Sequence, residues 1–213
     1  QWLWRDQIVD MLWPDLAPEA AERDFKVAFS ALNHVLEPDR PRSTPPFFVI
    51  RNDNMYRLNP DAHIVVDADQ FESYVNVEAG SVVELDSLQK ALALYEDDYL
   101  PETLYEDWVV PERERLRYLY MMAAGRLARL YLDLGRWDEA IQVANQTLAR
   151  DGCWEPGYRS LMSAYAKKGN LAQVKASYNR CSAMLEKELG VQPSEETTAL
   201  LSQLAESRHQ AVL

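Results

Sequence analysis

The sequence has little cysteine, histidine or glycine. Its 213 residues include two cysteines, three histidines and seven glycines. Cys153 and Cys181 do not have a common spacing of metal ligands, and His34, His63 and His209 lie far from one another along the chain. A glycine-rich phosphate-binding loop is also missing. We therefore expect no metal, no cofactor and no catalytic residues.

Long hydrophobic runs and a surplus of positive charge are missing too. No stretch approaches the roughly 20 apolar residues that cross a bilayer, and no basic and apolar leader is seen. We therefore expect a cytoplasmic protein with free thiols and no membrane partner. The net charge is −12; residues 1–66 hold 7 basic and 10 acidic residues, and residues 67–213 hold 15 and 24. Any nucleic-acid-binding surface must therefore be local.

The first 66 residues mix helical and strand patterns. Two amphipathic helices are predicted. The second begins at Pro18, because proline is favoured at the first helical position, and it runs to about Leu36 before Pro38. The segment FFVIRNDNMYRLN then indicates two short strands around Asp53-Asn54, residue types that tolerate the positive φ of a tight turn.

From Asp67 onward, nearly all of the sequence has helical periodicity and part of it repeats. Leucine, tyrosine and glycine recur 34 residues apart, as Leu127, Tyr131 and Gly135 and then as Leu161, Tyr165 and Gly169. This is the tetratricopeptide spacing, in which each helix pair has an apolar face that its neighbours must cover. Each glycine is expected to end the first helix of its pair in a left-handed conformation.

Further helices flank the two regular pairs. A degenerate pair is predicted at about 68–79 and 84–95, followed by the insert EDDYLPETLYEDWVVP. A final helix is expected after Pro193, with Ser194 as its N-cap and Glu195-Glu196 in its first turn.

Several segments, taken in order, resemble one group of bacterial regulators. DQIVDMLWPDLAPEAAERDFKVAFSALNHVLEP is similar to the helix-turn-helix half of OmpR-type winged helices in SARP-type activators, and MYRLNP resembles the end of their wing. The remaining segments resemble successive signatures of the bacterial transcriptional activator domain: VDADQFE, ALALYEDDYLPE, EDWVVPERERLR, YRSLMSAYAKKGN and KELGVQPSEET.

The resemblance implies a mainly α fold with two domains. Residues 1–66 would form a truncated winged helix-turn-helix with a β-hairpin wing, and residues 67–213 a helical, tetratricopeptide-like activator domain. The family's winged helix also has a small sheet and a first helix before the part that begins at Trp4. Without that first helix, five apolar side chains would lack cover: Ile8, Leu12, Phe25, Phe29 and Leu32. The full protein is therefore expected to extend upstream, as in larger maltose-activator-like regulators.

The resemblance also implies a DNA-binding face on the second helix. At 100° per residue, Phe25 and Phe29 share an apolar side with Leu32. We place five polar residues on the opposite, DNA-facing side: Arg23, Lys26, Ser30, Asn33 and His34. In the hairpin, Arg51 and Arg57 are expected to approach phosphates or the minor groove. Because this face carries few cations, we expect the fragment alone to bind DNA weakly.

A second candidate surface is the concave side of the repeats, where such arrays bind peptides or partner helices. Arg129 and Lys168 are candidate contributors. The acidic and aromatic insert suits a protein-facing surface, and it equally suits a segment that covers the end of the helix stack.

The sequence therefore predicts a transcription activator module. The winged helix would hold promoter DNA, and the helical domain would support a homodimer and contact RNA polymerase, as the resemblance implies. Upstream domains of the same polypeptide are further expected partners. The alternative is a protein-interaction module whose winged helix packs against those domains and no longer binds DNA by itself.

Overall fold

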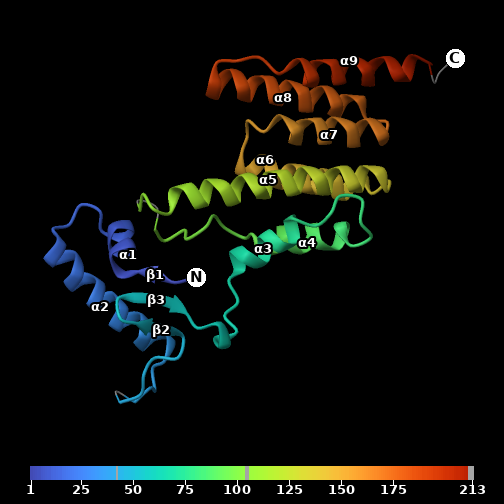
Figure 1. The fold of residues 1–213 in the computed structure, drawn as a ribbon. Coiled ribbons are helices and arrows are strands. Elements are labelled where there is room, and N and C mark those ends of the chain that lie inside the picture. The colour runs from blue at the N-terminus through green and yellow to red at the C-terminus, as the bar shows by residue number, and fades with distance from the viewer. Residues whose placement is uncertain (42, 104–105, 211–213) are drawn as a thin grey trace. The chain divides into compact units, whose positions relative to one another are not determined.

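The structure, a computed structural model, describes residues 1–41, 43–103 and 106–210, with side chains described as far as Glu206. It is mainly helical with one small sheet, as the sequence predicts (Figure 1). The chain forms two compact units. The first contains residues 1–66 and the described residues 106–110, and the second contains the remaining described residues.

The first unit contains two helices and a three-stranded antiparallel sheet. Its elements are β1 (Leu3–Trp4), α1 (Arg5–Leu12), α2 (Pro18–Leu36), β2 (Val49–Asn52), β3 (Met55–Leu58) and a short 3-10 turn, η1 (Pro60–Ala62). The predicted second helix and hairpin are confirmed, and Asp53 has the positive φ, 50°, of the tight turn. The strand β1 was not predicted, because two residues are too few to show an alternating pattern.

The sheet order is β1-β3-β2, so β3 is the middle strand. This strand packs against α2. Tyr56 of β3 meets Phe25 and Phe29 edge-on, with ring centroids 5.1 and 5.0 Å apart. Edge-to-face contacts at this distance are the favoured geometry of aromatic pairs. They attach the sheet to the apolar side of α2.

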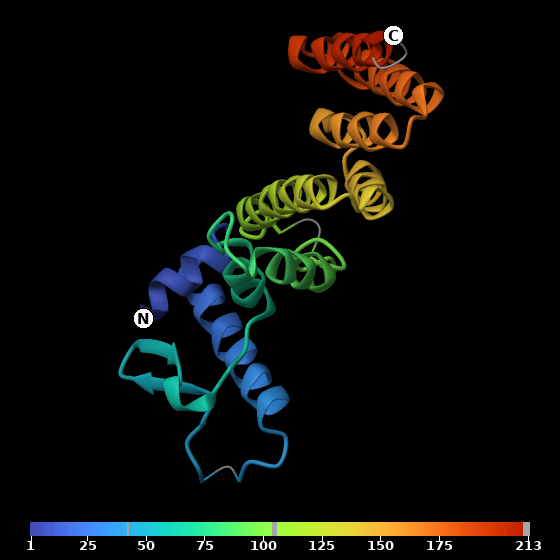
Figure 2. The same ribbon diagram turned by 90° about the vertical axis from the view of Figure 1, so that its right-hand side faces the viewer.

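The second unit is a series of antiparallel helices that follow one another along the unit (Figures 1 and 2). The helices are α3 (Asp67–Val75), α4 (Glu84–Leu94), α5 (Val110–Asp133), α6 (Trp137–Arg150), α7 (Glu155–Lys167), α8 (Leu171–Leu189) and α9 (Glu195–Gln210). The predicted degenerate pair corresponds to α3 and α4. Ser194 caps α9 as predicted, because its Oγ accepts a hydrogen bond from the Thr197 amide.

The 34-residue repeat appears as two equivalent helix ends. Gly135 and Gly169 both lie in the left-handed region, with φ of 71° and 73°. Behind each glycine, the next amide donates to a tyrosine carbonyl at 2.8 Å: Arg136 to Tyr131, and Asn170 to Tyr165. This six-to-one bond belongs to the Schellman motif, which turns the chain into the second helix of each pair.

The core of the second unit continues from one helix pair to the next. Leu88, Ala91 and Leu127 lie in one cluster of buried residues, which extends to Ala164 on α7. Tyr158 and Cys181 lie in a second cluster. Trp154 packs against both clusters, as expected for a residue that fills a helix interface. Helix α7 therefore has apolar neighbours on both sides, so the pairs depend on one another for burial.

The left-handed conformation of Gly135 can be tested by alanine substitution, with Gly125 inside α5 as the comparison. Gly135→Ala is expected to lower the free energy of unfolding by about 1 kcal/mol, because an added Cβ meets no atom there and only the backbone conformation is penalised. Gly125→Ala, inside α5 and equally free of contacts, is expected to raise it by about 0.5–1 kcal/mol. Urea unfolding measures both changes. Equal effects of the two substitutions would contradict the cap.

Candidate functional site

The exposed side of α2 is the first candidate surface. Arg23, Lys26, Ser30 and His34 are all exposed on it, as the helical spacing predicts. The Arg23 and Lys26 side chains are 71% and 69% exposed, so both can reach a ligand without rearrangement of the core.

The cations of this surface have acidic partners. Arg23 forms an ion pair with Asp24 at 3.1 Å, and Lys26 forms one with Glu22 at 3.0 Å. Glu22 also accepts a hydrogen bond from Arg5 at 3.0 Å. The hydrogen bond and charge of Lys26, followed by the charge of Arg5, lower the pKa of Glu22 below its usual value. The carboxylate thus stays charged at neutral pH and offsets the positive charge that DNA would meet.

Asn33 does not lie on the exposed side, and the prediction that it faces DNA is wrong. Its side chain is 3% exposed, and its amide nitrogen donates to the Phe29 carbonyl at 2.7 Å. The reason is the helical spacing itself, because a residue four positions after Phe29 lies one turn further along the same side. The buried amide also leaves its Oδ1 without a hydrogen-bond partner in the described part of the chain.

The hairpin does not bring Arg51 and Arg57 together. Arg51 is opposite Tyr56 and Arg57 is opposite Ile50 in the strand register. Because successive side chains alternate between faces, the two arginines lie on opposite faces of the sheet. The guanidinium of Arg51 lies 5.8 Å from the centroid of Tyr56, whereas that of Arg57 lies 4.5 Å from the centroid of Trp2.

An apolar hollow of about 270 Å³ opens between the helices and the sheet of the first unit. All five side chains predicted to lack cover line it: Ile8, Leu12, Phe25, Phe29 and Leu32. Trp13, Ala28, Val49 and Tyr56 complete its lining. The hollow contains almost no polar surface, so it suits an apolar side chain and not a charged ligand.

In the second unit, a groove of about 430 Å³ runs between α5, α7 and α9. Its charged lining residues are Arg126, Arg129, Arg159 and Glu196. Arg129, one of the two predicted interaction residues, therefore lines this groove. The other, Lys168, is not among its lining residues and instead forms an ion pair with Asp138 of α6.

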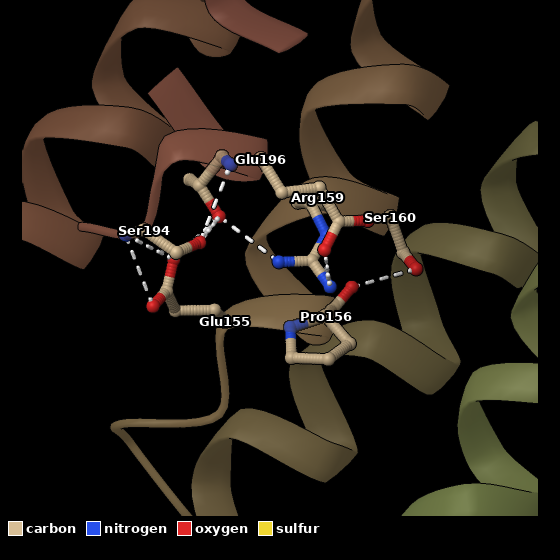
Figure 3. A network of polar contacts seen from close by, with 7 residues as sticks. Glu155, Pro156, Arg159, Ser160, Ser194 and Glu196 are labelled. Atoms are coloured by element: carbon tan, nitrogen blue, oxygen red, sulfur yellow. Dashed lines mark hydrogen bonds and ion pairs between the residues drawn. The ribbon is translucent and has the colours of Figure 1, made fainter. Parts of the chain in front are cut away.

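Figure 3 shows a polar network that includes Arg159 and Glu196, two lining residues of this groove. The Glu155 carboxylate accepts hydrogen bonds from the Ser194 amide at 3.0 Å, from the Ser194 hydroxyl at 2.7 Å, and from the Thr197 hydroxyl. Arg159 donates to the Thr197 hydroxyl at 3.0 Å and pairs with Glu196 at 3.1 Å. The network joins the start of α9 to α7 and holds the Arg159 guanidinium in place.

Arg126, another lining residue of the groove, is held by contacts to α4 and to the end of α3. Its guanidinium donates to Glu84 of α4 and to the carbonyls of Val75 and Val77, at 2.7–2.9 Å. A hydrogen bond from the Gly80 amide lowers the pKa of Glu84; burial opposes this effect and Arg126 adds to it. This partly buried ion pair thus fixes α5 against the first helix pair.

Arginines of α5 and α6 bind backbone carbonyls at the end of α4 and in the described part of the insert. Tyr95 is buried in the main core cluster, and its hydroxyl donates to Asp98 at 3.0 Å. Arg113 donates to the carbonyls of Tyr99 and Leu100 at 2.9 Å, and Arg150 donates to the carbonyl of Tyr95 at 3.0 Å. Residues 104 and 105 of the insert lie outside the described residues.

Within the described ranges, no group of three or more histidine, cysteine or acidic side chains is placed to hold a metal ion. Both cysteines are free thiols, as predicted. No helix in the same ranges combines the length and hydrophobicity needed to cross a membrane.

The Glu155 network makes a pH-dependent contribution to stability. Burial raises the pKa of Glu155, but hydrogen bonds from Thr197 and Ser194 outweigh it, and the pKa lies below the usual 4.5. The contribution is therefore complete above pH 4.5 and is lost as the pH falls through the lowered value.

Glu155→Gln is expected to reduce the free energy of unfolding at pH 7 by about 1–2 kcal/mol and to flatten its decline in acid. Denaturant unfolding at several pH values measures this. The control is Glu114→Gln, on an exposed part of α5; equal pH profiles for both variants would contradict the role of Glu155.

Comparison with known proteins identifies the family. The family model described as bacterial transcriptional activator domain matches residues 66–205. The chain is similar in structure to Mycobacterium tuberculosis EmbR in complex with a low affinity phosphopeptide, with a TM-score of 0.76 and 20% sequence identity. That match covers 97% of this chain and 55% of the EmbR chain, so the chain spans about half the length of EmbR.

At 20% identity, the likeness to EmbR concerns the fold alone. No curated protein sequence matches the chain. The family model, however, covers well over half of the residues and the whole of the helical array from α3 to α8. The chain therefore belongs to the bacterial transcriptional activator domain family, a family of transcription regulators.

Proposed function

We propose that this chain is a DNA-binding activator module of a larger transcription regulator. Residues 1–66 act as a winged helix-turn-helix that holds promoter DNA through α2. Residues 67–213 act as a tetratricopeptide-like domain that contacts RNA polymerase or a second copy of the protein. The observation that carries this proposal is the exposed side of α2, where Arg23 and Lys26 are accessible beside Ser30 and His34.

The arrangement of the first unit supports this role. Helix α2 is long, begins at a proline and follows α1 after a short turn, and its apolar side packs on the hairpin. A second helix whose exposed side carries cations and hydrogen-bonding side chains suits the major groove. Arg51 is exposed in the hairpin and suits a phosphate contact.

The second unit supports contacts with proteins. Its helix pairs form an array with a groove along the first helices of successive pairs, and repeat arrays commonly bind partners in such a groove. Residues 67–213 contain 15 basic and 24 acidic residues, a balance that disfavours extended contact with DNA. The two units would therefore divide the work, with DNA held by one and proteins by the other, in the cytoplasm.

The pairing of cations on α2 favours one alternative function. Because Glu22 and Asp24 offset Lys26 and Arg23, the first unit has few free positive charges for phosphates. In this alternative, the chain is a protein-interaction module and the first unit packs against upstream domains of the same polypeptide.

Charge substitutions on α2 distinguish the two functions. Arg23→Ala with Lys26→Ala in the full-length protein is expected to abolish most promoter occupancy in the host bacterium and activation with it. In titrations of a promoter fragment in vitro, the loss of two phosphate contacts reduces the slope of log affinity against log salt concentration by about 1.8. Glu22→Gln is expected to act in the opposite direction and strengthen binding several-fold, because it frees Lys26.

The matched control is Lys167→Ala with Lys175→Ala, which removes the same charge from exposed positions in the second unit. It is expected to leave the salt slope unchanged. Promoter occupancy that is unaffected by the α2 variant would refute DNA binding through α2 and favour the interaction module.

The apolar hollow of the first unit suits an upstream segment of the full protein. The family resemblance implies a first helix there, and an apolar helix side would cover Ile8, Leu12 and Leu32. This chain is expected to bind the dye ANS at the hollow, and a longer chain that includes the upstream helix is expected to bind much less. Leu12→Asp in the longer chain should restore dye binding or destabilise the unit. Equal dye fluorescence of the two chains would argue against this occupant.

A further inference from the structure

We infer that the groove between α5, α7 and α9 binds an acidic, amphipathic peptide segment of a partner protein. This inference deepens the proposed function, since it specifies the class of partner that the second unit takes. It does not require the first unit to bind DNA. The argument rests on the charge, the free side chain and the apolar surface of the groove.

The charge of the groove is opposite to that of its unit. Residues 67–213 contain 15 basic and 24 acidic residues, yet the charged lining of the groove consists of three arginines and one glutamate. Local charge, and not the total, decides which ligand a concave surface attracts. A carboxylate is therefore attracted to this groove and repelled by much of the remaining surface.

Arg129 differs from the other two arginines of the groove. Arg126 and Arg159 are committed to Glu84 and Glu196 and to neighbouring carbonyl or hydroxyl groups. Arg129 is exposed and has no hydrogen bond, ion pair or ring contact with the residues that the structure describes. An arginine offers a planar set of donors that matches a carboxylate in two parallel hydrogen bonds. The groove thus offers one free carboxylate-binding group in addition to two fixed ones.

The same groove has an apolar part. Met121, Met122, Leu132, Trp154 and Leu200 line it beside the arginines. Met122 is 42% exposed, so an apolar side chain of a ligand can reach it. Methionine, tryptophan and arginine are enriched in protein interfaces, and methionine adapts to varied apolar partners. A matching ligand therefore has apolar side chains next to carboxylates.

The size and charge of the groove favour a peptide over nucleic acid. A volume of about 430 Å³ accommodates a few side chains of a segment and not a folded domain. A nucleic acid would place its many phosphates beside Glu196 and against an acidic unit, with only one uncommitted cation to receive them. A short acidic peptide needs only the groove itself.

Binding can be tested with a defined probe and the full 213-residue chain. The probe is a fluorescein-labelled peptide of glutamate, aspartate and leucine, and the control peptide has lysine at every acidic position. Fluorescence anisotropy is expected to show saturable binding of the acidic peptide, weakened by salt, and no binding of the lysine peptide.

Two charge reversals locate the site. Arg129→Glu is expected to weaken binding of the acidic peptide about tenfold or more, as the loss of a charge-assisted hydrogen bond implies. Lys175→Glu makes the same change of charge at an exposed position of α8 outside the groove, and is expected to weaken binding less than about twofold. Far-ultraviolet circular dichroism checks that both variants remain folded.

Three results would overturn the inference: no binding of the acidic peptide, equal weakening by the two reversals, or loss of DNA binding without loss of peptide binding in Arg129→Glu. The last result would assign the groove to nucleic acid. Failure of the DNA test on α2 leaves the peptide measurement unchanged, so the two proposals fail separately.

Discussion

The structure of the second unit depends on one constraint, namely that a helical hairpin with apolar residues on two sides cannot bury both alone. Helix α7 shows this most clearly. Its Ala164 belongs to the cluster shared with α5 and α6, while Tyr158 and Leu161 belong to the cluster that includes Cys181 and Leu185 of α8. Removal of either neighbour would expose part of this helix to water. The array is therefore stable only as a series, which leaves its first helices side by side and creates a groove along them.

Besides the apolar contacts, arginine side chains stabilise the second unit through hydrogen bonds to backbone carbonyls. Arg113 and Arg150 satisfy backbone carbonyls of the segment after α4, and Arg126 satisfies those of Val75 and Val77 at and after the end of α3 while it pairs with Glu84. These guanidinium groups supply donors to carbonyls at or beyond helix ends, where a buried unpaired carbonyl would be costly. Much of the positive charge of the unit thus supports the fold. Arg129 remains as a cation that the fold does not use.

The sequence was sufficient for features that depend on nearby residues. Gly135 and Gly169 end their helices as the 34-residue spacing predicts, and Asp53 makes the predicted hairpin turn. Contacts between distant residues were not accessible in this way. Arg126 and Glu84 are 42 positions apart, and Arg150 and Tyr95 are 55 apart, so no local pattern indicates either pair.

The candidate site on α2 was predicted in part. Helical spacing placed Arg23 and Lys26 on the exposed side, but it did not show that Glu22 and Asp24 would pair with them. The assignment of Asn33 to the exposed side was wrong, because its polar type suggested that side whereas its position, one turn after Phe29, lies at the packed side. Residue type and helical angle disagreed there, and the angle decided the outcome.

The central claim is that this chain binds DNA weakly by itself, because the cations of its first unit are few and paired. Titration of promoter DNA with this chain at several salt concentrations tests it most directly. The account predicts weak binding with a shallow dependence of log affinity on log salt, which corresponds to about two or three phosphate contacts. A tight complex with a steep salt dependence would contradict it, as would the complete absence of binding at low salt.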